Sequence, residues 1–207
     1  MRIPSFGLFI TIAITSPALA AGADGPATHD AASHHAMAAS QSETFVQAVR
    51  EATAQFRDVN VATNPQNKYG LFPGCFSGPQ GGAMGVHFVN MELLGDGELD
   101  VSTPEALVYE PQANGALRLV GVEYIVTVAD WSKNHTGTPV LKVHPNDPNE
   151  VGQALQLVDG VPANDGFAHT PNRFGLPPFY ELHVWAWQDN PQGTFADWNT
   201  LVSCDKQ

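Results

Sequence analysis

The feature that most restricts the fold is a series of short apolar runs between residues 84 and 188, separated by clusters of Gly, Pro, Asn and Asp. The runs are "MGVHFVNMELL", "EALVYEP", "ALRLVGVEYIVTVA", "TPVLKVHP", "GQALQLV" and "FYELHVWAWQ". Each has the length and composition of a β-strand. Asn114-Gly115, between the second and third runs, is the strongest short hairpin signal in the chain. The series predicts antiparallel strands, with residues 116–129 at the centre.

One amphipathic helix is expected before these strands. Apolar residues recur at three- and four-residue spacing, at Phe45, Ala48, Val49, Ala52, Phe56 and Val59. Ser40 and Glu43 fit a capping box at its start, and Pro65 limits its length. The Gly- and Pro-rich stretch at residues 70–85 is interpreted as a loop. We therefore expect an α+β domain over residues 41–207, with one N-terminal helix packed on a curled antiparallel sheet or small barrel.

The N-terminus has the pattern of a secretory signal peptide over residues 1–20. Arg2 precedes an apolar run, and Ala18-Leu19-Ala20 supplies a small-x-small cleavage pattern. The alternative is a membrane anchor, but the run is shorter than the roughly 20 residues that span a bilayer. Residues 21–40 are rich in Ala, Gly and Ser and are interpreted as a disordered tether. We expect an exported protein, periplasmic or extracellular, without an integral membrane segment after cleavage.

Export changes the interpretation of the two cysteines, Cys75 and Cys204. An oxidising compartment permits a disulfide bond between them. The alternatives are two separate thiols or a catalytic cysteine, and neither has a local signature, because the chain contains no C-x-x-C motif. A disulfide closing so long a loop is worth about 4–5 kcal/mol in the chain-entropy model.

The formal net charge is −12, with nine Lys and Arg in 207 residues. Phosphate backbones are bound by basic patches, so this balance argues against a nucleic-acid partner and against anionic membrane surfaces. The motif search is also negative. "GCFSG" is not a nucleophile elbow, and the chain has no H-E-x-x-H, Walker or dinucleotide-binding motif. The sequence therefore names no reaction and leaves open whether the protein is an enzyme.

One group of polar residues is unusual. By strand alternation His87, Glu123 and His183 each lie on a face that is otherwise rich in apolar or aromatic side chains. If these faces line one interior, the three side chains converge. They would then form a buried hydrogen-bonded pair with a separate histidine, part of a small-molecule pocket, or a two-histidine, one-carboxylate site for a divalent transition metal such as Zn, Fe, Ni or Cu.

Four aromatic residues on the same runs are candidates for lining a pocket for a small-molecule ligand: Trp185, Trp187, Tyr124 and Phe88. His169 is a further ligand-binding candidate, because its Gly- and Pro-rich loop leads into the His183 strand. The functional hypotheses are a ligand-binding module or a structural module with a polar interior site. The alternative is a metalloprotein, which could be an enzyme.

Four blocks carry a resemblance to a family: "GAMGVHFVN", "PEALVYEP", "LRLVGVEYIV" and "YELHVWAWQDNP". The chain resembles, from about residue 57 to residue 204, a family of exported bacterial proteins of unknown function. The resemblance implies a bacterial exported origin and a single intact domain. It implies no catalytic residues, because no activity is established for the family.

Overall fold

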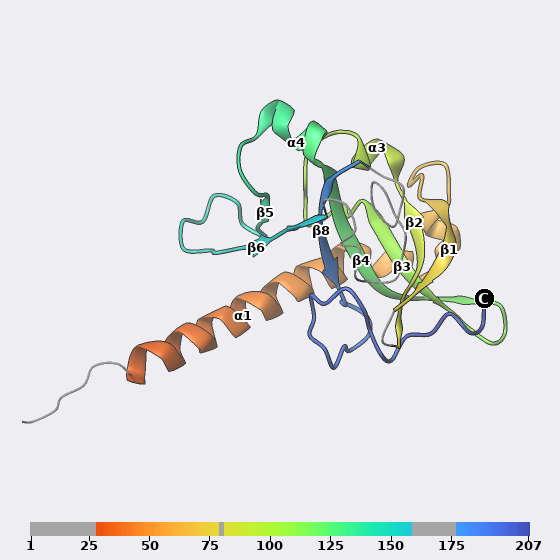
Figure 1. Ribbon diagram of the computed structural model, residues 1–207, viewed down its shortest axis with the longest axis horizontal. Coiled ribbons are helices and arrows are strands. Elements are labelled where there is room, and N and C mark those ends of the chain that lie inside the picture. Colours follow the sequence, from red (N-terminus) through yellow and green to blue (C-terminus); the bar gives the residue numbers. More distant parts are fainter. Residues whose placement is uncertain (1–27, 79–80, 159–176) are drawn as a thin grey trace, which may run out of the picture.

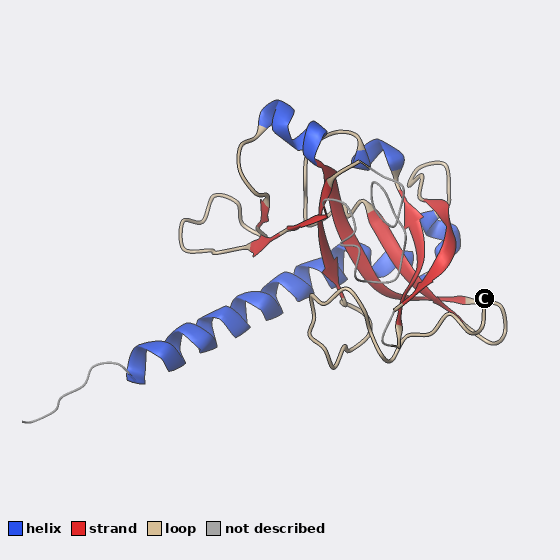
Figure 2. Cartoon of the chain, viewed as in Figure 1, coloured by secondary structure: helices blue, strands red, loops and turns tan. Residues whose placement is uncertain are grey.

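In the computed structural model of the chain, residues 28–78, 81–158 and 177–207 are described. Long helix α1 (Thr28–Thr53) lies against one face of a twisted antiparallel sheet and projects beyond it at its N-terminal end (Figures 1 and 2). Six strands form this sheet in the order β1-β2-β3-β4-β8-β7. The sheet is open, so the α+β prediction is confirmed and the barrel alternative is excluded.

The strands of the main sheet are β1 (Gly70–Ser77), β2 (Ala83–Val89), β3 (Ala106–Pro111), β4 (Leu117–Thr127), β7 (Gln156–Val158) and β8 (Phe179–Val184). A separate two-stranded hairpin pairs β5 (Val140–Leu141) with β6 (Gln153–Ala154). The short helical elements are η1 (Ala54–Arg57), α2 (Val59–Ala62), α3 (Met91–Leu94) and α4 (Val128–Asn134).

The long central strand is β4, as its apolar run predicts. It pairs with β3 on one side and β8 on the other, and β3 joins it through the predicted turn. At that turn the N–H of Gln112 donates to the carbonyl of Ala116 over 2.8 Å, and Gly115 has a φ of +80°. Glycine adopts that backbone conformation without steric penalty, which accounts for the hairpin signal.

The loop prediction for residues 70–85 is wrong in its first half, which forms edge strand β1. Its pairing with β2 is irregular between Phe72 and Cys75, where Pro73 and Gly74 interrupt the register. Proline lacks the N–H that a central strand needs, but an edge strand with a bulge tolerates it. The Gly- and Pro-rich composition therefore predicted a loop where the chain forms strand β1.

The helix also differs from its prediction. It begins at Thr28, within the range interpreted as a tether, so the expected start at Ser40 is wrong. Ser40 lies inside the helix, where its carbonyl accepts a hydrogen bond from the Thr44 hydroxyl over 2.9 Å. The segment before it is rich in alanine, which has the highest helix propensity. The predicted signal peptide at residues 1–20 lies outside the described residues.

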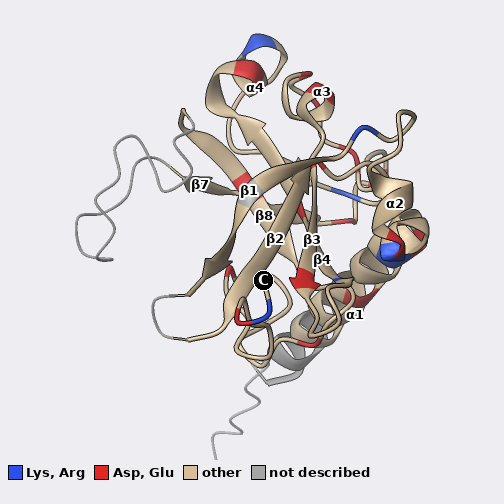
Figure 3. Ribbon diagram, turned by 90° about the vertical axis from the view of Figure 1, so that its right-hand side faces the viewer, with Lys and Arg blue, Asp and Glu red and all other residues tan. Residues whose placement is uncertain are grey.

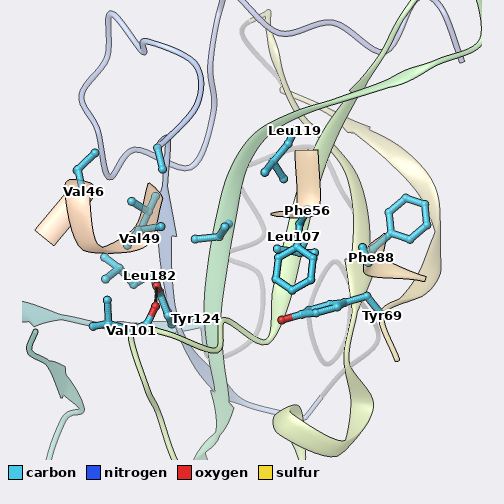
Figure 4. Close-up of a cluster of buried hydrophobic side chains, with 14 of the residues drawn as sticks. Val46, Val49, Phe56, Tyr69, Phe88, Val101, Leu107, Leu119, Tyr124 and Leu182 are labelled. Atoms are coloured by element: carbon cyan, nitrogen blue, oxygen red, sulfur yellow. Dashed lines mark hydrogen bonds between the residues drawn. The ribbon is translucent and has the colours of Figure 1, made fainter. Parts of the chain in front are cut away.

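The main core fills the space between α1 and the sheet (Figure 4). Phe45 and Val49 from the helix pack against Tyr124 and Leu182, and Phe45 meets the ring of Tyr124 edge-on at 6.2 Å. We call this side of the sheet the helix face. The opposite side, which we call the His–Glu face, carries two smaller apolar clusters, one around Val108 and Trp185 and one around Ile125 and Phe179.

The predicted disulfide is confirmed. Cys75 of β1 is bonded to Cys204 in the C-terminal segment, with a Cα–Cα distance of 5.7 Å. Val202 of that segment is buried beside Val108 and Trp185, so the bond holds the end of the chain on the His–Glu face. The disulfide is compatible with an oxidising compartment. Among the described residues, no helix is both long enough and apolar enough to cross a membrane.

Candidate functional site

Three polar residues meet on the His–Glu face, as the strand alternation predicts. Glu123 of β4 and His183 of β8 are directly opposite each other in the ladder. His87 of β2 lies beyond the intervening strand β3, which places Ala106 opposite Glu123 and Val108 opposite His87. These β3 side chains are small, so the longer side chains of His87 and Glu123 can meet across that strand.

The contacts converge on one carboxylate oxygen. Oε1 of Glu123 lies 2.9 Å from Nδ1 of His183, in hydrogen-bond geometry. Nε2 of His87 lies 3.2 Å from the same oxygen, but off the direction that a hydrogen bond requires, so this contact is electrostatic. All three side chains are at most 4% exposed.

The neighbouring rings fix the two imidazoles. His183 stacks on Trp185, with ring centroids 4.5 Å apart, and His87 meets Phe76 edge-on at 5.3 Å. Gly121 also lies beside the cluster, where a Cβ would come 2.8 Å from the carbonyl oxygen of Val184 and 3.6 Å from Nε2 of His183. A larger residue there would push β8 and its histidine away.

The electrostatics favour an ionised Glu123. Burial by itself raises the pKa of the carboxyl group, because a charge is poorly solvated inside a protein. The charge of His87 and the hydrogen bond with His183 act in the opposite direction and outweigh burial. The net result is a pKa well below the ordinary value for glutamate, so the group is a carboxylate at neutral pH.

Three ring nitrogens of the cluster have no hydrogen-bond partner among the described residues: Nδ1 and Nε2 of His87 and Nε2 of His183. Buried polar atoms in native proteins are nearly always paired, and each exception calls for an explanation. His87 therefore retains hydrogen-bonding capacity that the described part of the protein does not use.

A small cavity of about 50 Å³ adjoins His87 and Glu123. Its wall is apolar apart from three residues, and its lining consists of Phe72, His87, Val89, Met91, Leu94, Glu123, Ile125, Phe179 and Glu181. A single water needs only about 10–15 Å³ measured in this way, so the space accommodates a group of a few heavy atoms. Met91, at 64% exposure, connects the cavity with the surface.

The described residues contain no group of three His, Cys, Asp or Glu side chains arranged to hold a metal ion. His87, Glu123 and His183 are close together, as predicted, but both histidine nitrogens approach the same carboxylate oxygen. They therefore contact the carboxylate itself and do not surround a common empty point. The metal site remains a prediction.

The aromatic ligand candidates divide between the two faces. Trp185 lies on the His–Glu face beside His183. Tyr124 and Phe88 lie on the helix face, where the Tyr124 hydroxyl donates to the carbonyl of Val101 over 2.7 Å (Figure 4). The expectation that they line one pocket together with Trp185 is wrong, because successive strand residues point to opposite faces.

The two-residue alternation of "ELHVWAW" predicts Trp187 on the same face as His183 and Trp185, and this prediction is wrong. Regular pairing of β8 ends at Val184, and the N–H of Trp185 then donates to Thr194. The N–H of Trp187 returns to the carbonyl of Val120, with its ring packed against the helix-face core. This irregularity breaks the two-residue alternation on which the prediction depended. His169 lies outside the described residues.

Sequence reasoning missed Glu181 as a site residue. It is 4% exposed and lines the cavity together with His87 and Glu123. The signal was present, because the alternation of "ELHVWAW" places Glu181 on the same face as His183. Phe72 was also missed, since it belongs to the strand that the glycines and proline concealed.

No family model, curated protein or solved structure matches this chain. The resemblance to a family of exported bacterial proteins therefore stays a prediction.

Proposed function

We propose that this protein is an exported small-ligand-binding module whose site is the cavity beside His87. The observation that carries the proposal is that both ring nitrogens of His87 are buried, with no hydrogen-bond partner in the described part of the chain, next to space for a few heavy atoms. Such a combination of an apolar wall and a few convergent polar groups is typical of small-molecule sites.

The lining indicates the kind of ligand. Glu123 and Glu181 contribute carboxyl groups to one wall, and Glu123 is ionised. Around them stand Phe72, Met91 and Phe179, which are apolar. The site suits a compact polar group that donates hydrogen bonds, such as an ammonium or hydroxyl group, attached to a short apolar body.

The test uses n-propylammonium chloride as the probe and follows the imidazole C–H resonances of the protein by NMR. We expect saturable shifts of the His87 resonances at millimolar concentration, since a ligand of four heavy atoms gains at most about 1.5 kcal/mol per atom. n-Propanol serves as the uncharged counterpart, and a stronger response to the ammonium ion supports recognition by the carboxylates.

A matched pair of variants locates the site. Met91→Trp fills the entrance to the cavity and should abolish the His87 shifts. Leu71→Trp changes a similarly exposed apolar residue, 60% exposed, that does not line the cavity, and should leave them intact. Shifts that persist in Met91→Trp would contradict the proposal.

Metal analysis of tag-free protein distinguishes the proposed ligand-binding module from the alternative, a metalloprotein. Near-stoichiometric transition metal that is lost in His183→Ala would favour the metalloprotein and replace the organic ligand. If the protein binds neither a metal nor the probe, the polar cluster has only a structural role and the proposal is wrong.

A further inference from the structure

A second, larger cavity lies elsewhere on the molecule and shares no residue with the cavity beside His87. It occupies about 550 Å³ between η1, the β3–β4 turn and the C-terminal segment. Figure 1 shows the C-terminus next to that hairpin. Small-molecule sites measure roughly 300–1,000 Å³, so this space is large enough for a metabolite-sized ligand.

The cavity is lined by a concentration of positive charge. Arg57, Arg118 and Lys206 are three of the nine Lys and Arg in a chain of net charge −12. No Asp or Glu belongs to the lining. Acidic residues, red in Figure 3, are otherwise frequent and occur within strands as well as in loops. The lining of the cavity therefore has a charge opposite to that of the chain as a whole.

The three cationic side chains differ in whether they already have hydrogen-bond or ion-pair partners. Arg118 donates to the carboxylate of Glu110 over 2.6 Å and to the side-chain oxygen of Gln188 over 2.7 Å. Arg57 and Lys206 form no ion pair with any described residue. With Glu110 counted against Arg118, Arg57 and Lys206 are the two cations beside the cavity that have no ion-pair partner among the described residues.

Trp187 gives the cavity a rigid aromatic wall. Its indole N–H donates to the hydroxyl of Thr53 over 3.0 Å, and the guanidinium of Arg57 lies 5.4 Å from its ring centre. Such a cation–π contact leaves the charge and the N–H groups of an arginine available to a ligand. Leu117 and Leu119 add apolar surface next to these groups.

We propose that this cavity binds a small organic anion that carries at least two negative charges as phosphate or carboxylate groups. Arg57 and Lys206 hold the anionic groups, and the Trp187 wall contacts the remainder of the ligand. Arginine presents paired N–H donors that match both kinds of oxyanion, and lysine adds a compact charge. This second site does not depend on the ligand proposed for the His87 cavity.

Isothermal titration calorimetry with pyrophosphate and with citrate tests the proposal at low salt and at 150 mM NaCl. We expect saturable one-site binding of at least one of them, weakened by salt and accompanied by a change in tryptophan fluorescence. Tighter binding of pyrophosphate assigns the site to phosphates, and tighter binding of citrate assigns it to polycarboxylates. Absence of saturable binding of both at low salt would overturn the proposal.

Charge-neutral variants distinguish a site from general attraction. Arg57→Gln and Lys206→Gln should each weaken binding about tenfold. Lys142→Gln removes an equal charge from a partly buried lysine outside the cavity and should change binding by less than twofold. Equal losses in Lys206→Gln and Lys142→Gln would show that only the net charge acts, and would reject the site. Met91→Trp should leave anion binding unchanged, which separates this site from the His87 cavity.

Discussion

Two buried glutamates, Glu123 in β4 and Glu105 directly before β3, have pKa values that are shifted in opposite directions. Ala106, which follows Glu105 in the chain, pairs directly with Glu123, and both glutamates are 2–3% exposed. Glu123 meets two imidazoles and its pKa falls. Burial raises the pKa of Glu105 to about 8, with only a partial offset from the N–H of Ile125, which donates to its carboxyl over 2.9 Å. Nearby Asp96 and Asp100 raise it further.

The difference shows that partners, more than depth, decide whether a buried acid is charged. A backbone N–H supplies a dipole, whereas an imidazole supplies a hydrogen bond and, when protonated, a full opposite charge. Glu105 is therefore a neutral acid within the fold, and Glu123 is a carboxylate with hydrogen-bonding capacity next to a cavity. The candidate site therefore centres on Glu123 and not on Glu105.

The largest loss of stability is expected when the carboxylate of the His87, Glu123 and His183 cluster is removed. Glu123→Ala should lower the free energy of unfolding by about 3–5 kcal/mol, because it removes the hydrogen-bond partner of the buried His183 and the carboxylate charge next to His87. Urea unfolding at pH 7 measures this loss, and Glu51→Ala on the exposed side of α1 is the control, with an expected change within about 0.5 kcal/mol. The double variant with His183→Ala should lose less than the sum of the two single losses. Strict additivity would mean that the pair is not coupled.

Glu105→Gln should have the opposite effect and raise the free energy of unfolding at alkaline pH. A pKa raised in the folded state means that Glu105 contributes most to stability below its ordinary pKa of 4.5, and that this contribution is lost as the pH rises through about 8. Glutamine stays neutral and keeps an oxygen for the Ile125 N–H. The variant should therefore be more stable than wild type at pH 8, by on the order of 3 kcal/mol, with a much smaller difference at pH 4.5.

Urea midpoints at the two pH values give the result. A difference that is independent of pH would show that Glu105 does not titrate between them. The contribution of Glu123 runs in the other direction, because its pKa is lowered. It is present above pH 4.5 and is lost as the pH falls below that value.

The smallest effect concerns His87. His87→Phe keeps a ring beside Phe76 and breaks no hydrogen bond, so we expect a loss of about 1 kcal/mol at pH 7. The informative change is expected at acidic pH, in the curve of stability against pH that we call the acid limb. Without the charge of His87 the pKa of Glu123 should rise, and acid unfolding should begin at a higher pH. An acid limb identical to that of wild type would show that His183 alone controls the carboxylate. His144→Phe, at an exposed histidine, is the matched control.

Much of the sheet could be predicted from local pattern. The apolar runs identified β2, β3, β4 and β8, and Asn114-Gly115 identified the turn between two of them. Strand alternation also put His183 and Glu123 on one face, because its period of two is imposed by the backbone. The same rule failed for Trp187, beyond the end of β8, and a composition rule failed for β1, where a bulge accommodates Pro73.

The sequence by itself determined the α+β class, the disulfide partners and the inward direction of His87, Glu123 and His183, since these follow from periodicity and from the presence of just two cysteines. Only the tertiary structure decided that β3 carries small side chains between His87 and Glu123, that Glu181 joins them, and that Arg57, Arg118 and Lys206 gather at one cavity. Strand order and register bring these residues together from distant parts of the chain. No local spacing records such contacts, because they depend on which strands become neighbours.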